Sequence, residues 1–233
     1  WLVSQVQADG SLRSVGQSLA TTTQAETEVY ETLKLLGVSP PGLAQRVAAA
    51  VPDESVEHSA RLLLARALQS TQIETALDRL RGMQNADGGF GGSRGYGSDT
   101  LDTALAVVAL RAAGDRNSNG LARAVTFLAE RLVDLDTLAL HAGDGARPYR
   151  AAYQLLALQM ASPHFPIAAA VESARNQLLA LQGAGSHSET LNNAIAAIAL
   201  SYTSAGGTGL DSLRSALRAS QAADGSWSQD PYL

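Results

Sequence analysis

The sequence predicts an all-α fold that occupies residues 1–233 as one domain. Three observations lead to this prediction. Alanine and leucine carry most of the apolar mass, while aromatic residues make up 5% of the chain, a composition that suits closely packed helices better than a sheet. Asp-Gly turns recur along the chain, and the segments between them alternate between Ala-rich and more charged helical patterns.

The Asp-Gly turns mark a repeat with a period of about forty residues, which is the range of two-helix repeats. They lie at Asp9-Gly10, Asp87-Gly88, Asp144-Gly145 and Asp224-Gly225. The first interval is about twice the period. Residues 51–55, which contain a proline and two acidic residues, supply the missing boundary inside it.

Each repeat is expected to contain one buried helix and one helix that faces water. The Ala-rich segments with few charges are residues 22–36, 55–68, 98–113, 147–160 and 188–203. The more charged, amphipathic segments that follow them are residues 42–51, 73–83, 120–132, 167–181 and 211–220, and residues 1–7 form a helical stub before them. A helix that is apolar nearly all round is buried, whereas a charged face borders water. We therefore expect an inner and an outer layer of helices.

The ends of the Ala-rich segments carry matching signals. Ser98 and Ser188 each precede an acidic residue, where a hydroxyl caps free N–H groups and the helix dipole favours negative charge. About five helix pairs with small inner residues favour closure into an α/α barrel, or toroid, that is incomplete at its ends. An open solenoid is the alternative, because the repeat alone does not specify closure.

Two copies of the turn share a longer pattern, in which a leucine stands four residues before a glutamine and Asp-Gly and an aromatic residue follow. They run from Leu80 to Phe90 and from Leu217 to Trp227. The pattern resembles the QW-type repeat of the prenyltransferase and squalene/terpene cyclase superfamily of α/α toroids. The resemblance implies that the glutamine ties the turn to the start of the next helix and that the aromatic ring stacks against it. The residues in these structural roles would be Gln84, Asp87, Phe90, Gln221, Asp224 and Trp227.

The resemblance also implies several activities, each with its own chemical signature. Zinc-dependent prenyltransferases and thioester domains need cysteine, and the chain has none. Class II cyclases use an Asp-x-Asp-Asp acid cluster and class I enzymes an Asp-Asp-x-x-Asp magnesium site, and the sequence contains neither motif. Asp99 with Asp102 approximates the acid cluster but lacks its third carboxylate. We therefore expect no catalytic residue, no metal site and no cofactor.

A column of polar residues marks the expected ligand site. Two residues before a buried alanine of four inner segments stand His58, Asp102, Arg150 and Asn192. In a closed barrel they would surround one end, where helix N-termini favour a small polar ligand or an anion. Tyr153 would face the centre, and Tyr96 would lie at the rim, in the Gly-rich loop 87–98. The alternative is a polar entrance in which Arg150 and Asp102 pair with each other and bind nothing.

These observations favour a non-catalytic module that binds a small ligand or a protein. We expect it to belong to a larger bacterial protein and to lie outside the cytoplasm or at the cell surface, because the ends of the chain resemble those of an excised domain. A net charge of −5 disfavours nucleic acid as a partner, and no apolar run is long enough for membrane insertion. The alternative function is a cyclase-like enzyme whose acid motif is not recognisable.

Overall fold

The chain folds into helices, as its sequence predicts. The computed structural model describes residues 1–13, 21–51, 53–131, 146–183, 190–202 and 207–227. Within these ranges it contains eleven helices and no β-strand, which confirms the all-α class. The expected Asp144-Gly145 turn and the Ser188 cap lie outside the described residues. No helix in the described ranges is both long and apolar enough to reach across a bilayer.

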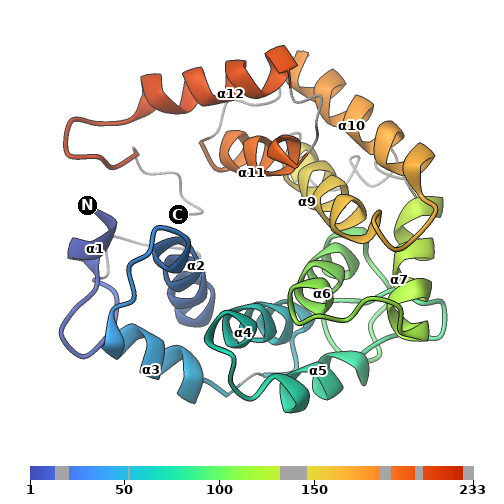
Figure 1. Cartoon of the computed structure of the whole chain (residues 1–233), viewed down its shortest axis with the longest axis horizontal. Helices are drawn as coiled ribbons and strands as arrows, with labels where there is room; N and C mark the ends of the chain where they lie inside the picture. The colour runs from blue at the N-terminus through green and yellow to red at the C-terminus, as the bar shows by residue number, and fades with distance from the viewer. Residues whose placement is uncertain (14–20, 52, 132–145, 184–189, 203–206, 228–233) are drawn as a thin grey trace.

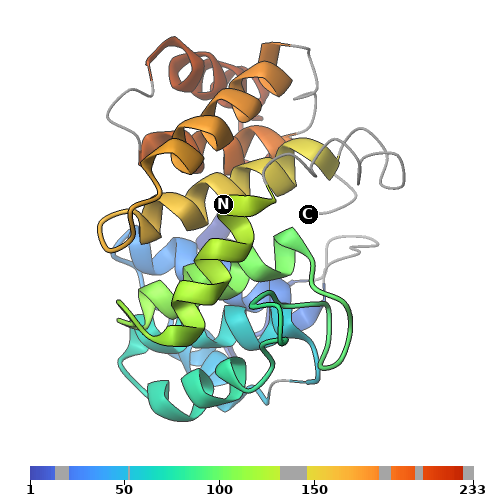
Figure 2. The same cartoon turned by 90° about the vertical axis from the view of Figure 1, so that its right-hand side faces the viewer.

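Inner and outer helices alternate along the chain (Figure 1). The inner layer consists of α2 (Thr22–Leu35), α4 (Val56–Gln69), α6 (Thr100–Ala112), α9 (Ala146–Ala161) and α11 (Thr190–Ser201). The outer layer consists of α1 (Leu2–Gln5), α3 (Pro41–Ala49), α5 (Ile73–Arg81), α7 (Asn119–Glu130), α10 (Ala168–Gly183) and α12 (Gly207–Ser220). Each inner helix contacts the next inner helix and the outer helix that follows it. In the view at right angles the chain progresses from teal at the bottom to red at the top (Figure 2).

Alanine lets the inner helices approach one another closely. On α6, Ala104, Ala106 and Ala109 are buried, and so are Ala152 and Ala157 on α9. Because a methyl group keeps the two backbones close while still excluding water, helices that meet through alanine pack tightly. These residues belong to a large apolar cluster that extends from α4 to α12, and a smaller cluster joins α2, α3 and α4.

A carboxylate fixes the start of α6. Asp99 is its N-cap, and Oδ1 of Asp99 accepts hydrogen bonds from the backbone N–H groups of Leu101 and Asp102. The predicted cap, Ser98, is therefore wrong by one residue. Ser98 instead donates its hydroxyl to Asp87 in the preceding turn, at 2.7 Å. Serine and aspartate both cap well, so only the position of the turn decides which of two neighbouring residues does so.

Three turns share one backbone conformation at their glycine. Gly10, Gly88 and Gly225 have φ angles of +83°, +89° and +88°, a region that other residues rarely adopt. Gly88 also lies against α7, because a Cβ at this position would be 2.8 Å from the Cβ of Arg123. Glycine thus lets the turn before α6 pack onto the outer helix that follows α6.

The aspartate before the glycine closes the turn. Asp87 Oδ1 accepts from the N–H of Gly89 at 3.1 Å, and Asp224 Oδ1 accepts from the N–H of Ser226 at 2.9 Å. A serine hydroxyl also donates to each carboxylate, from Ser98 to Asp87 and from Ser226 to Asp224. These hydroxyls hold the pKa of both carboxyls below the ordinary value.

Gln84 joins its turn to the next outer helix. Its Nε2 donates to the carbonyl oxygens of Gly88, at 2.8 Å, and of Gly120 at the start of α7, at 2.7 Å. Its Oε1 accepts from Nη2 of Arg123 at 2.7 Å. Gln221, in the last turn, donates at 2.9 Å to a carbonyl within its own turn. The first glutamine therefore connects two parts of the fold, and the second stabilises a local hairpin.

The aromatic residues of these two turns have different surroundings. Phe90 is 1% exposed and belongs to the large apolar cluster, and its carbonyl accepts from the N–H of Asp99 at 2.8 Å. Trp227 is 38% exposed, and its indole N–H donates to the carbonyl of Leu217 at 2.8 Å. Phe90 thus anchors the start of α6 in the core, whereas Trp227 folds back onto α12.

Replacing each glutamine by alanine separates the two roles. Gln84→Ala leaves two backbone carbonyls without their donor, and at about 1 kcal/mol per hydrogen bond we expect it to lower the free energy of unfolding by about 2–3 kcal/mol. Gln221→Ala removes one exposed bond, so we expect a loss of about 1 kcal/mol or less. Urea denaturation of both variants measures the difference, and equal losses would contradict a connecting role for Gln84.

Candidate functional site

The inner helices keep a narrow stripe that is less deeply buried than their other sides. On α6, Leu105 and Val108 are buried but keep 7% exposure, whereas Val107 beside them keeps none, and the more exposed Leu101 and Ala112 continue this stripe at helical spacing. Helix α6 contacts α4, α7 and α9. Because those neighbours cover its other sides, the stripe faces the centre that the inner helices surround (Figure 1). The equivalent stripes of the other inner helices identify the residues that could meet a ligand.

Charged residues occupy the stripe near the start of α4. Arg61 is 5% exposed, and its Nε donates to Oε1 of Glu57, one turn earlier, at 2.9 Å. Its Nη1 forms an ion pair with Glu28 of α2. A buried guanidinium needs such carboxylates, because desolvation of an unpaired charge is costly. Arg61 therefore joins two inner helices at the centre of the layer.

Two tyrosines of α9 complete this group of side chains. The rings of Tyr149 and Tyr153 lie 4.8 Å apart between their centroids, at an interplanar angle of 59°. Burial raises the pKa of both hydroxyls, and the positive charge of Arg61 opposes that rise. The charge of Arg61 thus influences the hydroxyls of both tyrosines from another helix. We call Glu28, Glu57, Arg61, Tyr149 and Tyr153 the central cluster.

Glu31 of α2 lies next to the central cluster. Burial raises the pKa of its carboxyl to about 8, the charge of Glu28 adds to the rise, and Arg61 opposes it. At neutral pH Glu31 is therefore mostly protonated. Its Oε1 is buried and has no hydrogen-bond partner among the described residues. Glu31 thus combines a raised pKa with a buried oxygen that accepts no hydrogen bond from the described residues.

A second charged group lies at the start of α6 and α9. Arg150 Nη1 donates to Asp99 Oδ2 at 2.6 Å, so Asp99 both caps α6 and neutralises Arg150. Burial raises the pKa of the Asp102 carboxyl to about 6, and the charges of Asp99 and Glu57 contribute to this rise. Arg150 opposes it. Three carboxylates and one arginine are thus electrostatically coupled at this end of the inner layer.

The predicted polar column is brought together only in part. Asp102 and Arg150 lie in the same coupled group, although Arg150 pairs with Asp99 rather than with Asp102. His58 lies elsewhere: its Nδ1 is 2.6 Å from Oδ2 of Asp53, and its Nε2 is 3.0 Å from the hydroxyl of Thr21. It therefore links the start of α4 to the start of α2.

The remaining predicted site residues occupy separate positions. Asn192 is buried on α11, and Tyr153 belongs to the central cluster. Tyr96 is 69% exposed on the Gly-rich loop, and its carbonyl accepts from the side chain of Asn85 at 2.8 Å. Another carbonyl of this loop, that of Gly92, accepts from the N–H of Val56 at 3.1 Å. The loop is thus held against the start of α4, with the Tyr96 ring directed into solvent.

Of the central cluster, only Tyr153 was predicted from the sequence as a site residue. The available signals were the four-residue spacings of Glu57 with Arg61 and of Tyr149 with Tyr153, which place each pair on one helix face. The position of Arg61 within an Ala- and Leu-rich segment, which also contains Arg66, was a further signal. The contribution of Glu28 could not be read in this way, because α2 supplies it from another helix.

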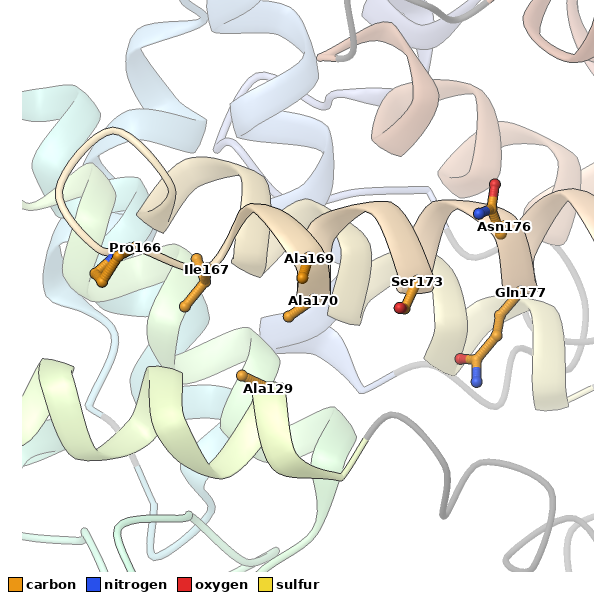
Figure 3. A pocket seen from close by; sticks show the side chains of 8 residues that line it. All are labelled: Ala129, Pro166, Ile167, Ala169, Ala170, Ser173, Asn176 and Gln177. Atoms are coloured by element: carbon orange, nitrogen blue, oxygen red, sulfur yellow. The ribbon is translucent and has the colours of Figure 1, made fainter.

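A shallow hollow on the outer layer is a weaker candidate (Figure 3). It measures about 700 Å³ and is lined almost entirely by α10 and the residues just before it, with Ala129 contributed by α7. Its lining contains no charged side chain, and its polar groups belong to Ser173, Asn176 and Gln177. Within the described ranges no three histidine or acidic side chains gather as metal ligands would. The inner layer therefore holds the chemistry-bearing residues.

Replacing Glu31 by glutamine tests its protonation. In the folded chain Glu31 keeps its proton up to about pH 8, whereas the unfolded chain loses it near the ordinary value of 4.5. Its contribution to stability is therefore full below about pH 4.5 and is lost as the pH rises to about 8. Glu31→Gln cannot lose this proton, so it removes the pH-dependent loss of stability. As the pH rises, the free energy of unfolding of the variant should therefore increase relative to that of the wild type, by at most about 1.4 kcal/mol per pH unit.

Urea denaturation at pH 5 and at pH 8 measures this gain. Glu74→Gln, an exposed position on α5, is the matched control and should follow the wild type at both values. If the free energies of unfolding of Glu31→Gln and the wild type differ by the same amount at both pH values, Glu31 is already ionised in the folded chain.

Models of known protein families do not match this chain, and a comparison with curated protein sequences finds no match either. What the site does therefore has to follow from its own geometry and chemistry.

Proposed function

We propose that the chain is a non-catalytic binding module whose ligand is a small molecule held at the centre of the inner helices. The observation that carries this proposal is Arg61, a buried arginine with one nitrogen that has no hydrogen-bond partner among the described residues. Nη2 of Arg61 is buried and has no partner among the described residues. A buried donor left unpaired costs stability, so its retention favours a ligand that pairs with it. A small ligand fits better than a protein, because Arg61 is inside the helical array.

The architecture proposed for this function is an α/α toroid. One observation near the ends of the chain supports closure. A Cβ at Gly225 would lie 3.7 Å from the Cβ of Trp1, which is ordinary van der Waals contact. The last turn thus lies beside the start of the outer layer. The resemblance of the turns to QW-type repeats supports the same architecture.

Acid catalysis is the second candidate function, and Asp102 favours it. A carboxyl with a pKa near 6 is partly protonated at neutral pH, and coupled carboxylates are a recognised way to keep one acid protonated. Asp99 is already engaged with Arg150 and with the start of α6. As a general acid, Asp102 would therefore lack the preorganised pair of carboxylates that an Asp-x-Asp-Asp motif supplies. For this reason the binding function is better supported than acid catalysis.

Binding at the centre is tested with Nile red, an uncharged dye whose emission rises in apolar surroundings. We expect one molecule to bind per chain. Val108→Phe fills the centre and should weaken dye binding about tenfold while changing the free energy of unfolding by less than about 1 kcal/mol. Val107→Phe, one residue along α6, packs between helices and should lower that free energy by about 1–3 kcal/mol. Equal destabilisation by both substitutions, or no dye binding, would contradict the proposal.

Catalysis is tested by incubation with squalene, farnesyl diphosphate and geranylgeranyl diphosphate. We expect no product from any of them, because the sequence contains neither acid nor magnesium motif. Gas chromatography with mass spectrometry of the extracts measures this outcome. Product formation that is abolished by Asp102→Asn would establish the enzyme and refute the binding module.

A further inference from the structure

Two of the Asp-Gly turns pack against the outer helix that comes one inner helix later in the chain. A Cβ at Gly10 would collide with the backbone of Gly42 in α3, and a Cβ at Gly88 would be 2.8 Å from the Cβ of Arg123 in α7. Between the turn and its outer helix the chain forms one inner helix, which is α2 in the first case and α6 in the second. A turn and the outer helix that it contacts are therefore separated by one inner helix.

The last turn packs in the same way against α1, but no inner helix accompanies it among the described residues. A Cβ at Gly225 would be 3.7 Å from the Cβ of Trp1, which immediately precedes α1. The inner helices on the two sides are α11, which contacts α9 and α12, and α2, which contacts α1, α3 and α4 (Figure 1). The spacing of turns and outer helices thus leaves a place for one more inner helix between α11 and α2.

Helix α11 is exposed on the side where this helix would lie. Val108 on α6, Leu156 on α9 and Ile198 on α11 occupy the same position, six residues after the polar column that the sequence indicates. Val108 and Leu156 are each 7% exposed, whereas Ile198 is 49% exposed. Tyr202, one turn further along α11, is 61% exposed. Because α9 and α12 cover their own sides of α11, the cover that is missing is that of a next inner helix.

The last turn shows the same loss of burial when it is compared with the turn before α6. Leu80 is fully buried, whereas Leu217, at the same position of the pattern, is partly exposed. Phe90 and Trp227, which end the two copies, differ in the same direction. In the first copy an inner helix, α6, follows the turn and belongs with Phe90 to one apolar cluster. The last turn lacks such a helix among the described residues.

The far side of this place is formed by α2. Thr32 and Leu36 follow one another at helical spacing and are exposed, whereas Tyr30, which packs towards α3 and α4, is 1% exposed. On α11, Ala194 and Ala197 are partly exposed. Alanine is the residue through which the inner helices approach one another, so these faces suit a helix better than a sheet or a loop.

We propose that α11 and α2 bind one Ala-rich helix of a partner polypeptide between them, in the position of an additional inner helix. A second copy of this chain is a poor source of such a helix, because its α4, α6 and α9 are packed between their own neighbours. The surface that receives the helix is called the open helix site, and it consists of Thr32, Leu36, Ile198, Tyr202, Leu217 and Trp227. Arg61 lies on α4, outside this site, so the small-molecule function proposed above stands or falls separately.

A synthetic peptide of residues 98–113 is a suitable probe, because these residues form the inner helix that follows the equivalent turn. The chain contains two tryptophans, Trp1 and Trp227, both of which border the site, and the peptide contains none. We expect the tryptophan emission to shift to shorter wavelength and to saturate at one peptide per chain, with a Kd of about 10 μM. Absence of a shift, or an equal shift with a peptide of the same composition in scrambled order, overturns the inference.

Substitutions on the two flanking helices test where the peptide binds. Ile198→Glu and Leu36→Glu each place a charge on a face that is already exposed, so circular dichroism should show a folded chain while peptide binding weakens at least about tenfold. Val51→Glu, at a position that is 86% exposed and outside the site, is the control and should bind within about twofold of the wild type. An equal loss in Val51→Glu, or unchanged binding in either of the other two variants, overturns the placement between α11 and α2.

Sedimentation velocity distinguishes a partner helix from a second copy. We expect the wild-type chain without peptide to sediment as a monomer at the concentrations of the titration. A dimer that Ile198→Glu dissociates would show that a second copy covers the site, and it would overturn the assignment to a partner polypeptide.

Discussion

Close approach of the inner helices is the constraint on which the rest of the structure depends. Alanines such as Ala104 and Ala152 cover the sides where these helices meet, so little room remains there for a long side chain. Larger residues such as Leu62 and Leu158 are buried on other sides of these helices, and the stripe that faces the centre also carries large and charged side chains. Arg61 occupies such a stripe, and because it is 5% exposed its charge must be balanced locally. Glu57 and Glu28 provide that balance, the second from a neighbouring helix.

The layered fold could be predicted because its signals are local in the chain. Helical spacing separates Ala-rich from charged segments, and Asp-Gly punctuates them, so the alternation of inner and outer helices follows without knowledge of any contact. Gln84 shows the same principle at a single residue, since the turn that contains it could be identified from its neighbours. Its bond to Gly120 depends on how α7 returns, and only the resemblance to QW-type repeats suggested it.

The sequence predicted where along the inner helices the candidate site lies, but it did not predict which face of each helix is turned towards the centre. The alignment on buried alanines placed Asp102 and Arg150 near one end, and they are coupled there. Alanine, however, covers several sides of an inner helix, so the column did not specify which side faces the centre. His58 illustrates the consequence. It lies one residue after Glu57, about 100° further around α4, and contacts Thr21 rather than the central cluster.

The electrostatics of the helix ends bear on the proposed binding at the centre. Exposed N-termini of inner helices attract negative charge, and the sequence suggested that a ligand supplies it through Arg150. In the structure Asp99 supplies it instead, by capping α6 and pairing with Arg150. Burial raises the pKa of Asp102 beside it, and the charges of Asp99 and Glu57 add to that rise, so a further buried negative charge is unfavourable there. Because Asp99 neutralises both the helix end and Arg150, this end of the inner layer offers no free positive charge to an anion. Under the proposed binding function, selectivity would then depend on shape and on hydrogen bonding at Arg61.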